Sequence, residues 1–284
     1  MRFRVSPKVR TVCLKLSVAI VFLAWLGSVA CNEPASAPPP PMPSSPWGGR
    51  YAYSYDLPAD MAKAQAGSVP VTIAVVNPSY RETDSALASP LYSGVGKGLS
   101  LSMGTDLDKM LIAKGVTSTG PFASLDDITY SEKKGANLTL APRVFISVDF
   151  KQSPFQMVSG TERQESRFVL NVTGWITFIM QEPMTGEKLW IKKLEIEPVQ
   201  SQGVIAQEEI ADYSNAGGCG GPTFVGYHAG QVLFDGRADA MATALKQIYP
   251  VVMARFYKFL ETDEMIELKA RGMEIRANKV YTGN

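Results

Sequence analysis

A two-residue alternation between Phe168 and Met180 constrains the fold of this chain more than any other feature. Because successive side chains of a strand point to opposite faces, apolar residues at every second position predict a strand with one buried face. The opposite face mixes apolar and polar residues, so we expect it to be partly covered. Gly174 completes the buried face, whose apolar members are Phe168, Leu170, Val172, Ile176, Phe178 and Met180.

A turn follows this strand directly, at the residues Glu182-Pro183-Met184-Thr185-Gly186. Proline is pre-set for the first corner of a type I turn, and glycine can take the left-handed conformation that closes a short hairpin loop. An apolar return strand, Lys188–Glu197, comes next. We expect this antiparallel pair to be the scaffold on which the rest of the domain packs.

Other stretches supply the remaining strands and the main helices. Val69–Val76 is a continuous apolar run, typical of a strand buried on both faces, and Leu138–Phe150 is a further strand. Apolar residues at three- and four-residue steps predict a helix between Leu91 and Lys114 that ends at Gly115. The same spacing predicts a long helix from Ala238 to Leu260.

Shorter signals give the remaining local predictions. Ser124 is expected to cap a short helix that runs through Lys134 and closes at Gly135. Asp235 is a candidate cap for the long helix, and Pro250 should kink or break it. Residues 197–235, which contain a run of glycines, are expected to form a long loop.

Together these elements predict an α+β domain over residues 51–284. Its antiparallel-rich mixed sheet would carry helices packed mainly on one face. A three-layer α/β/α arrangement is the alternative, since the strand Val69–Val76 calls for cover on both sides. The net charge of +1 argues against a nucleic-acid partner, because phosphate binding depends on clustered Lys and Arg.

Residues 1–30 are typical of a secretory leader, with basic residues before the apolar run Leu16–Leu26. The small residues before Cys31 resemble the processing site of bacterial lipoproteins, although Ser28 stands where that pattern usually has Leu. We therefore expect acylation of Cys31, with membrane lipid as its partner, and an extended proline-rich tether over residues 31–50. The alternative is ordinary cleavage, which leaves Cys31 a free or paired thiol.

The sequence offers no convincing catalytic or metal-binding constellation, so no enzyme activity, cofactor or metal is expected. Ser93–Gly98 superficially resembles a phosphate-binding loop, but Leu91 stands where that pattern requires glycine. His228 is the only histidine, and its neighbours resemble neither a nucleophile elbow nor a zinc helix, so we interpret it as a loop or core residue. The carboxylate pairs Glu208-Glu209 and Asp126-Asp127 are interpreted as solvated or capping groups.

Cys219 lies between two glycine pairs. If Cys31 is acylated, Cys219 is unpaired in an oxidising compartment, where it could act as a reactive thiol or form an intermolecular disulfide. The interpretation we favour is a buried small residue in a tight turn.

The hairpin also carries a resemblance to a known family. The segment Glu182–Glu187, together with Asp108–Gly115, Tyr130–Gly135 and the helix Asp239–Leu260, resembles the neuraminyllactose-binding hemagglutinin family. The similarity runs from about Val71 to Leu260, and the hairpin is its most specific part. Members of this family are lipid-anchored adhesin candidates of the bacterial envelope. The resemblance therefore implies an outer-membrane lipoprotein with a binding role, whose partner is a surface glycan or an envelope protein.

The family is credited with binding sialylated glycans through a Lys/Arg-rich stretch between its two middle strands. The corresponding interval here, Lys151–Arg167, contains only one further base, Arg163, and two acids, Glu162 and Glu165. A sialic acid carboxylate is best held by a bidentate arginine. We therefore expect weak or no sialyllactose binding. Two other classes stay open: a periplasm-facing accessory protein docked on an envelope assembly and, last in rank, an enzyme with an unrecognised site.

Overall fold

The computed structural model describes residues 51–57, 64–80, 85–159, 161–214 and 223–281. The chain divides into two compact units, Met1–Ser45 and Pro46–Asn284, and every described residue belongs to the second. The predictions for the leader, for Cys31 with its tether, and for Cys219 lie outside the described residues.

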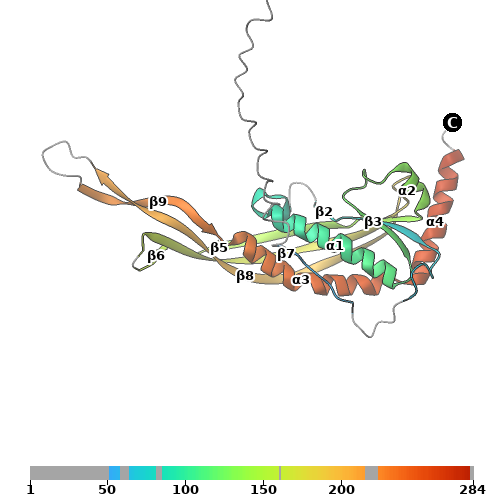
Figure 1. Cartoon of the computed structure of the whole chain (residues 1–284), viewed down its shortest axis with the longest axis horizontal. Helices are drawn as coiled ribbons and strands as arrows, with labels where there is room; N and C mark the ends of the chain where they lie inside the picture. Colours follow the sequence, from blue (N-terminus) through green and yellow to red (C-terminus); the bar gives the residue numbers. More distant parts are fainter. Residues whose placement is uncertain (1–50, 58–63, 81–84, 160, 215–222, 282–284) are drawn as a thin grey trace, which may run out of the picture. The chain divides into compact units, whose positions relative to one another are not determined.

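One mixed sheet forms the body of the domain (Figure 1). Its strands follow the order β2-β5-β7-β4-β1-β3, and β8 pairs with β7 and with β9. β1 pairs in parallel with β3 and β4, whereas β7 pairs antiparallel with β4, β5, β6 and β8. The strands are β1 (Thr72–Val76), β2 (Ser79–Tyr80), β3 (Thr117–Phe122), β4 (Leu138–Leu140), β5 (Arg143–Gln152), β6 (Gln156–Met157), β7 (Arg163–Gln181), β8 (Lys188–Ser214) and β9 (Thr223–Asp235).

The strand β7 is the scaffold that its alternation predicts. All the predicted core side chains from Phe168 to Met180 are buried, and most of the residues on its opposite face are half-buried. The predicted hairpin is also confirmed. Gly186 has φ +70°, its N–H donates to the carbonyl oxygen of Glu182 at 2.9 Å, and β8 returns antiparallel along β7.

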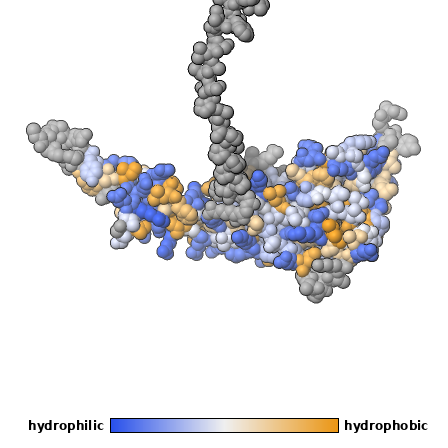
Figure 2. Space-filling view, in the orientation of Figure 1, coloured by the Kyte–Doolittle hydropathy of each residue, from blue (hydrophilic) through white to orange (hydrophobic). Residues whose placement is uncertain are grey.

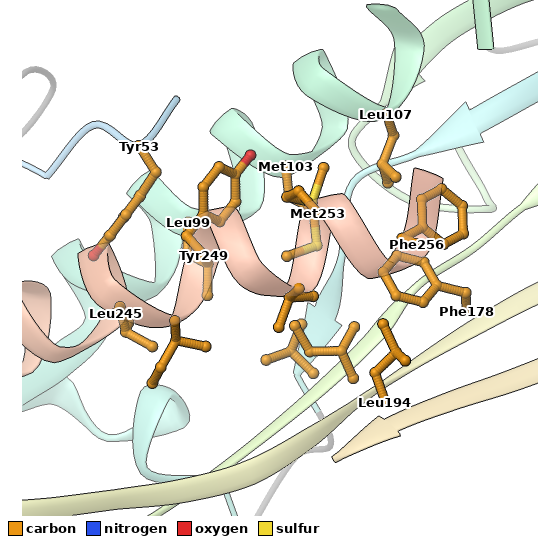
Figure 3. Packing of buried hydrophobic residues seen from close by; sticks show 14 of the residues in the cluster. Tyr53, Leu99, Met103, Leu107, Phe178, Leu194, Leu245, Tyr249, Met253 and Phe256 are labelled. Carbon is orange, nitrogen blue, oxygen red and sulfur yellow. The ribbon is translucent and has the colours of Figure 1, made fainter. Parts of the chain in front are cut away.

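Two long helices, α1 (Ser93–Ala113) and α3 (Arg237–Phe259), cover one face of the sheet (Figure 3). The helix α3 packs against β7 and β8, where the rings of Phe178 and Phe256 stack with centroids 3.9 Å apart, and α1 packs against β1, β3 and α3. Fully burying one such side chain contributes about 1.5–3 kcal/mol. The remaining helical elements are α2 (Tyr130–Gly135), α4 (Thr262–Tyr281) and two 3-10 turns, η1 (Ala86–Ala88) and η2 (Pro90–Tyr92).

Two glycines determine how α1 ends and what packs against it. Gly115 has φ +82°, and the N–H groups of Gly115 and Val116 donate to the carbonyl oxygens of Ile112 and Leu111, which ends the helix in a Schellman motif. A Cβ on Gly98 would lie 1.9 Å from the carbonyl oxygen of Tyr51. The glycine-rich first half of α1 therefore lets the segment 51–57 lie close against the helix.

The first strand is buried on both faces, as its continuous apolar run predicts. Ile73 and Val75 belong to the main core beneath α1, whereas Ala74 packs in a second cluster with Ile128 and Ala136. The chain around α2 thus provides local cover on the opposite face. The α+β class is confirmed, with α1 and α3 together on one face and three layers only around β1.

Two expectations about element boundaries are wrong, and one of the two alternatives for Pro250 is excluded. The short helix α2 begins after Thr129 rather than Ser124, because Thr129 and Glu132 form a capping box. The strand expected over 138–150 is divided into β4 and β5 around Pro142, which has no N–H to donate to a ladder. The helix α3 does not break at Pro250. This proline is exposed, so water can hydrate the carbonyl group that loses its partner.

The largest correction concerns residues 197–235. Instead of a loop, the described part of this stretch forms the outer part of β8 and all of β9. The expected cap at Asp235 is also displaced: Gly236 is the N-cap of α3, and Asp235 accepts a hydrogen bond from the backbone N–H of Arg237 at 3.0 Å.

Candidate functional site

A two-stranded ribbon extends from the sheet at one end of the domain. β8 continues past the end of β7 and pairs with β9, from Ile205 opposite Asp235 to Ser214 opposite Thr223. Figure 1 shows this ribbon reaching away from the helices. Residues 205–214 and 223–235 are called the arm below; it is two-stranded from Glu209 outward, because residues 205–208 also pair with β7.

The arm exposes large apolar side chains, and Figure 2 shows apolar patches on it among hydrophilic residues. Tyr213 and Phe224 lie opposite each other and make an edge-to-face contact with ring centroids 6.0 Å apart. Exposed apolar side chains gathered on one element in this way favour an interaction site. Its members, between 41% and 65% exposed, are Ile210, Tyr213, Phe224, Val225, Val232, Leu233 and Phe234.

A groove of about 610 Å³ lies near the base of the arm. Its lining consists of three stretches of consecutive residues: 151–153 at the end of β5, 167–169 in β7 and 202–204 in β8. Lys151 and Val169 are directly opposite each other in the sheet, as are Arg167 and Val204. These side chains share the face turned away from α1 and α3, called the outer face below. None of the lining residues is acidic.

The bases of the interval 151–167 differ in their surroundings. The guanidinium of Arg163 lies 2.6 Å from the carboxylate of Glu165, and the ammonium of Lys151 lies 3.7 Å from that of Asp149. Arg167 is exposed, and its backbone carbonyl accepts a hydrogen bond from the Ser153 hydroxyl at 2.9 Å. Lys151 and Arg167 therefore make the groove cationic, but two of the three bases have acidic neighbours.

Further along the outer face, an aromatic pair joins β5 to β7. The rings of Phe145 and Trp175 stack with centroids 4.0 Å apart, and the Lys193 ammonium lies 4.3 Å from the Trp175 ring. Both rings are half-buried, in agreement with the partial cover that the mixed composition of this face predicts.

The carboxylate of Asp106 is buried in the body of the domain. It accepts hydrogen bonds from the Tyr249 hydroxyl, the Tyr55 backbone N–H and the Lys109 ammonium at 2.8, 2.8 and 2.9 Å. Burial, and then the hydrogen bond to Asp106, raise the pKa of Tyr249. Asp106 thus ties the segment 51–57 and α3 to α1, and its acceptor sites are occupied.

A second carboxylate, that of Glu182, is fully buried at the β7–β8 turn. Arg276 from α4 lies 2.6 Å from it and also donates to the carbonyl oxygens of Lys134 and Ala136. Burial alone would raise the pKa of Glu182, but hydrogen bonds from the backbone at Thr185 and Met184 and from Arg276 outweigh it and hold that pKa below its usual range. This cluster joins three elements and is structural.

Sequence reasoning missed both buried acids. Asp106 could have been found, since it falls on the buried stripe of α1 between Met103 and Met110. Glu182 has no local signal, because Arg276 follows it by 94 residues.

The structure places the other candidates apart from one another. His228 lies exposed in β9, with Nδ1 2.9 Å from the Asp212 carboxylate, so its interpretation as a loop or core residue is wrong. Ser93–Gly98 forms the start of α1. Glu209 accepts a hydrogen bond from Gln164 at 2.7 Å, and Asp127 accepts one from Ser124 at 2.8 Å.

Two kinds of feature are absent from the described residues. No group of His, Cys, Asp and Glu side chains among them could hold a metal ion. No helix in this part of the chain combines the length and apolar character that crossing a membrane requires.

Comparisons with known proteins find similarity in structure alone. No protein-family model and no curated protein matches the chain. A neuraminyllactose-binding hemagglutinin homolog from Helicobacter pylori is 14% identical and aligns over 76% of this chain and 97% of its own, with a TM-score of 0.48. It bears the name of the family that the hairpin residues resemble.

Two lipoproteins are also similar. One from Neisseria meningitidis is 14% identical, covering 48% of this chain and 84% of its own with a TM-score of 0.23. A minor lipoprotein from Acinetobacter baumannii is 13% identical, covering 66% and 87% with a TM-score of 0.21. At these sequence identities and TM-scores, the structural similarities do not indicate a ligand or an activity.

Proposed function

We propose that this protein is a lipoprotein of the bacterial envelope that acts as a binding module without catalysis. Lipid on Cys31 would hold it at a membrane, and the tether over residues 31–50 would present the domain 51–284 to a partner. The leader, the small residues before Cys31 and the proline-rich stretch support the anchor. The outer membrane is the location that the family resemblance favours.

The binding role rests on the outer-face groove. Its volume of about 610 Å³ lies within the range of about 300–1,000 Å³ typical of ligand sites. Lys151 and Arg167 supply positive charge, and Val169 and Val204 supply apolar surface between them. This combination suits an acidic segment of an envelope partner that also carries apolar groups.

Support for a non-catalytic role comes from the buried acids. Asp106 and Glu182 are the carboxylates that a catalytic role would use first, since burial is a common route to a reactive acid. Both already accept several hydrogen bonds that hold separate elements together.

Fractionation tests the anchor. Cys31→Ser should move the protein from the membrane pellet to the soluble fraction, because no helix among the described residues can cross a bilayer. Unchanged pelleting after a high-salt wash would contradict the proposal. Protease treatment of intact cells then separates two orientations, since only a surface-displayed domain would be cleaved.

Sialyllactose binding tests the adhesin alternative. With Arg163 engaged by Glu165 and Lys151 near Asp149, the groove lacks a cluster of free arginines. We expect calorimetry on the mature chain with Cys31→Ser to show weak or no binding. Micromolar affinity that is lost on Arg167→Ala would instead favour a sialylated glycan as the ligand.

A further inference from the structure

The strand β9 is an open edge. Within the described residues it pairs with β8 and with no other strand. Proteins usually protect long edges with lysine, proline or inward-pointing charges, because exposed N–H and C=O groups pair readily with a further strand. The 13 residues of β9 include no Lys, Arg or Pro. The one acid, Asp235, lies at the base of the arm, where it forms a bidentate ion pair with Arg237.

The arm carries apolar side chains beside this edge. Phe224 and Val225 are neighbours along β9, as are Leu233 and Phe234, so the exposed apolar side chains lie on both faces of the ribbon. Edge pairing would place those of two copies side by side on each face, and apolar side chains that neighbour one another across strands stabilise a sheet.

The charge distribution favours a second copy as the occupant. The acids of the arm, Glu208, Glu209 and Asp212, are on β8, one strand away from the open edge. Two β9 edges would meet without like charges between Thr223 and Phe234. With strands about 4.8 Å apart, the acids of the two copies would be separated by about 14 Å, beyond the screening length of about 8 Å at physiological salt.

We propose that two copies of this protein associate through antiparallel pairing of β9 with β9 about a two-fold axis, so that their sheets become continuous. Pairing along the whole strand places the axis at Ala229, the central residue of β9. Such an isologous contact uses the same edge on both copies and therefore closes at a dimer. The inference is independent of the lipid anchor and of the ligand of the groove.

Sedimentation velocity on the mature chain, with Cys31→Ser and a reducing agent present, provides the test. The wild-type β9 should give a dimer. Val225→Lys with Val232→Lys introduces the lysines that natural edges use, at positions 65% and 54% exposed, and should weaken self-association at least about tenfold. Val251→Lys, at a position 49% exposed on α3, is the matched control and should leave the dimer unchanged.

Crosslinking tests the pairing without charge substitutions. Ala229→Cys, in a chain that also carries Cys31→Ser and Cys219→Ser, should form a disulfide between copies under mild oxidation. Val225→Cys should not, because pairing centred on Ala229 separates the two Val225 positions by several residues. A monomer at all concentrations, a dimer that the β9 lysines do not weaken, or a dimer that Ala229→Cys does not crosslink would each overturn the proposal.

Discussion

The buried ion pair between Glu182 and Arg276 allows a quantitative test of how α4 is held. Arg276→Ala leaves a fully buried carboxylate without its cation and removes donors from the carbonyl groups of Lys134 and Ala136. Removing one partner of a buried pair costs about 3–5 kcal/mol. The side chain of Arg276 is 27% exposed, so water can replace part of the interaction, and we expect a loss of about 2–3 kcal/mol.

Urea unfolding of the mature chain with Cys31→Ser measures this loss at pH 7. Arg255→Ala is the matched control, because Arg255 lies 2.7 Å from the Glu197 carboxylate but both side chains are exposed. An exposed pair contributes about 0–1 kcal/mol. If the two variants lose the same free energy of unfolding, the buried ion pair of Glu182 stabilises the fold no more than an exposed pair does, which would refute the prediction.

The same pair predicts a dependence on pH. Because the pKa of Glu182 is lowered in the folded protein, its ionised form stabilises the fold above the usual value of 4.5. That stabilisation is lost as pH falls through the folded-state pKa. In Arg276→Ala the carboxylate loses a donor that lowers its pKa. The difference in the free energy of unfolding between this variant and wild type should therefore be largest at pH 7 and shrink towards pH 4. A difference that is constant over this range would show that it does not arise from the ionised carboxylate.

Three further substitutions test local features by thermal or urea unfolding. Gly186→Val should cost about 1–2 kcal/mol, because a β-branched residue is strained at φ +70°, and an unchanged stability would refute the turn assignment. Gly98→Ala should cost about 1–3 kcal/mol, since its Cβ would collide with the backbone of Tyr51; wild-type stability would show that this segment does not lie against α1. Thr129→Ala should cost about 0.5–2 kcal/mol by removing the capping box with Glu132, and no loss would place the start of α2 elsewhere.

The central hairpin could be predicted from the sequence because one face of β7 is buried throughout. A buried face must be apolar at every second position, and this leaves a pattern from Phe168 to Met180. The stripe of α3 was predictable for the same reason. Two boundaries differ from the prediction for local reasons: Pro142 separates β4 from β5, and Thr129 caps α2. The spacing of apolar residues contains no information about either effect.

The arm could not be predicted because its outer part is largely exposed. Without a continuous core face, β9 has no need of alternation. Gly226 and Gly230 also favour a turn when the sequence is taken alone. The groove was missed for a different reason: its lining comes from three strands whose register fixes which side chains become neighbours.

The unbroken course of β8 has a mechanical consequence. Its 27 residues run from the turn beside Gly186 to the outer end of the arm, a contour of up to about 90 Å at 3.3 Å per residue. Near its start, the indole N–H of Trp190 donates to Glu264 of α4 at 2.8 Å. A load applied at the arm would therefore travel along the backbone of β8 to Trp190, and the hydrogen bond from Trp190 to Glu264 would pass part of it to α4.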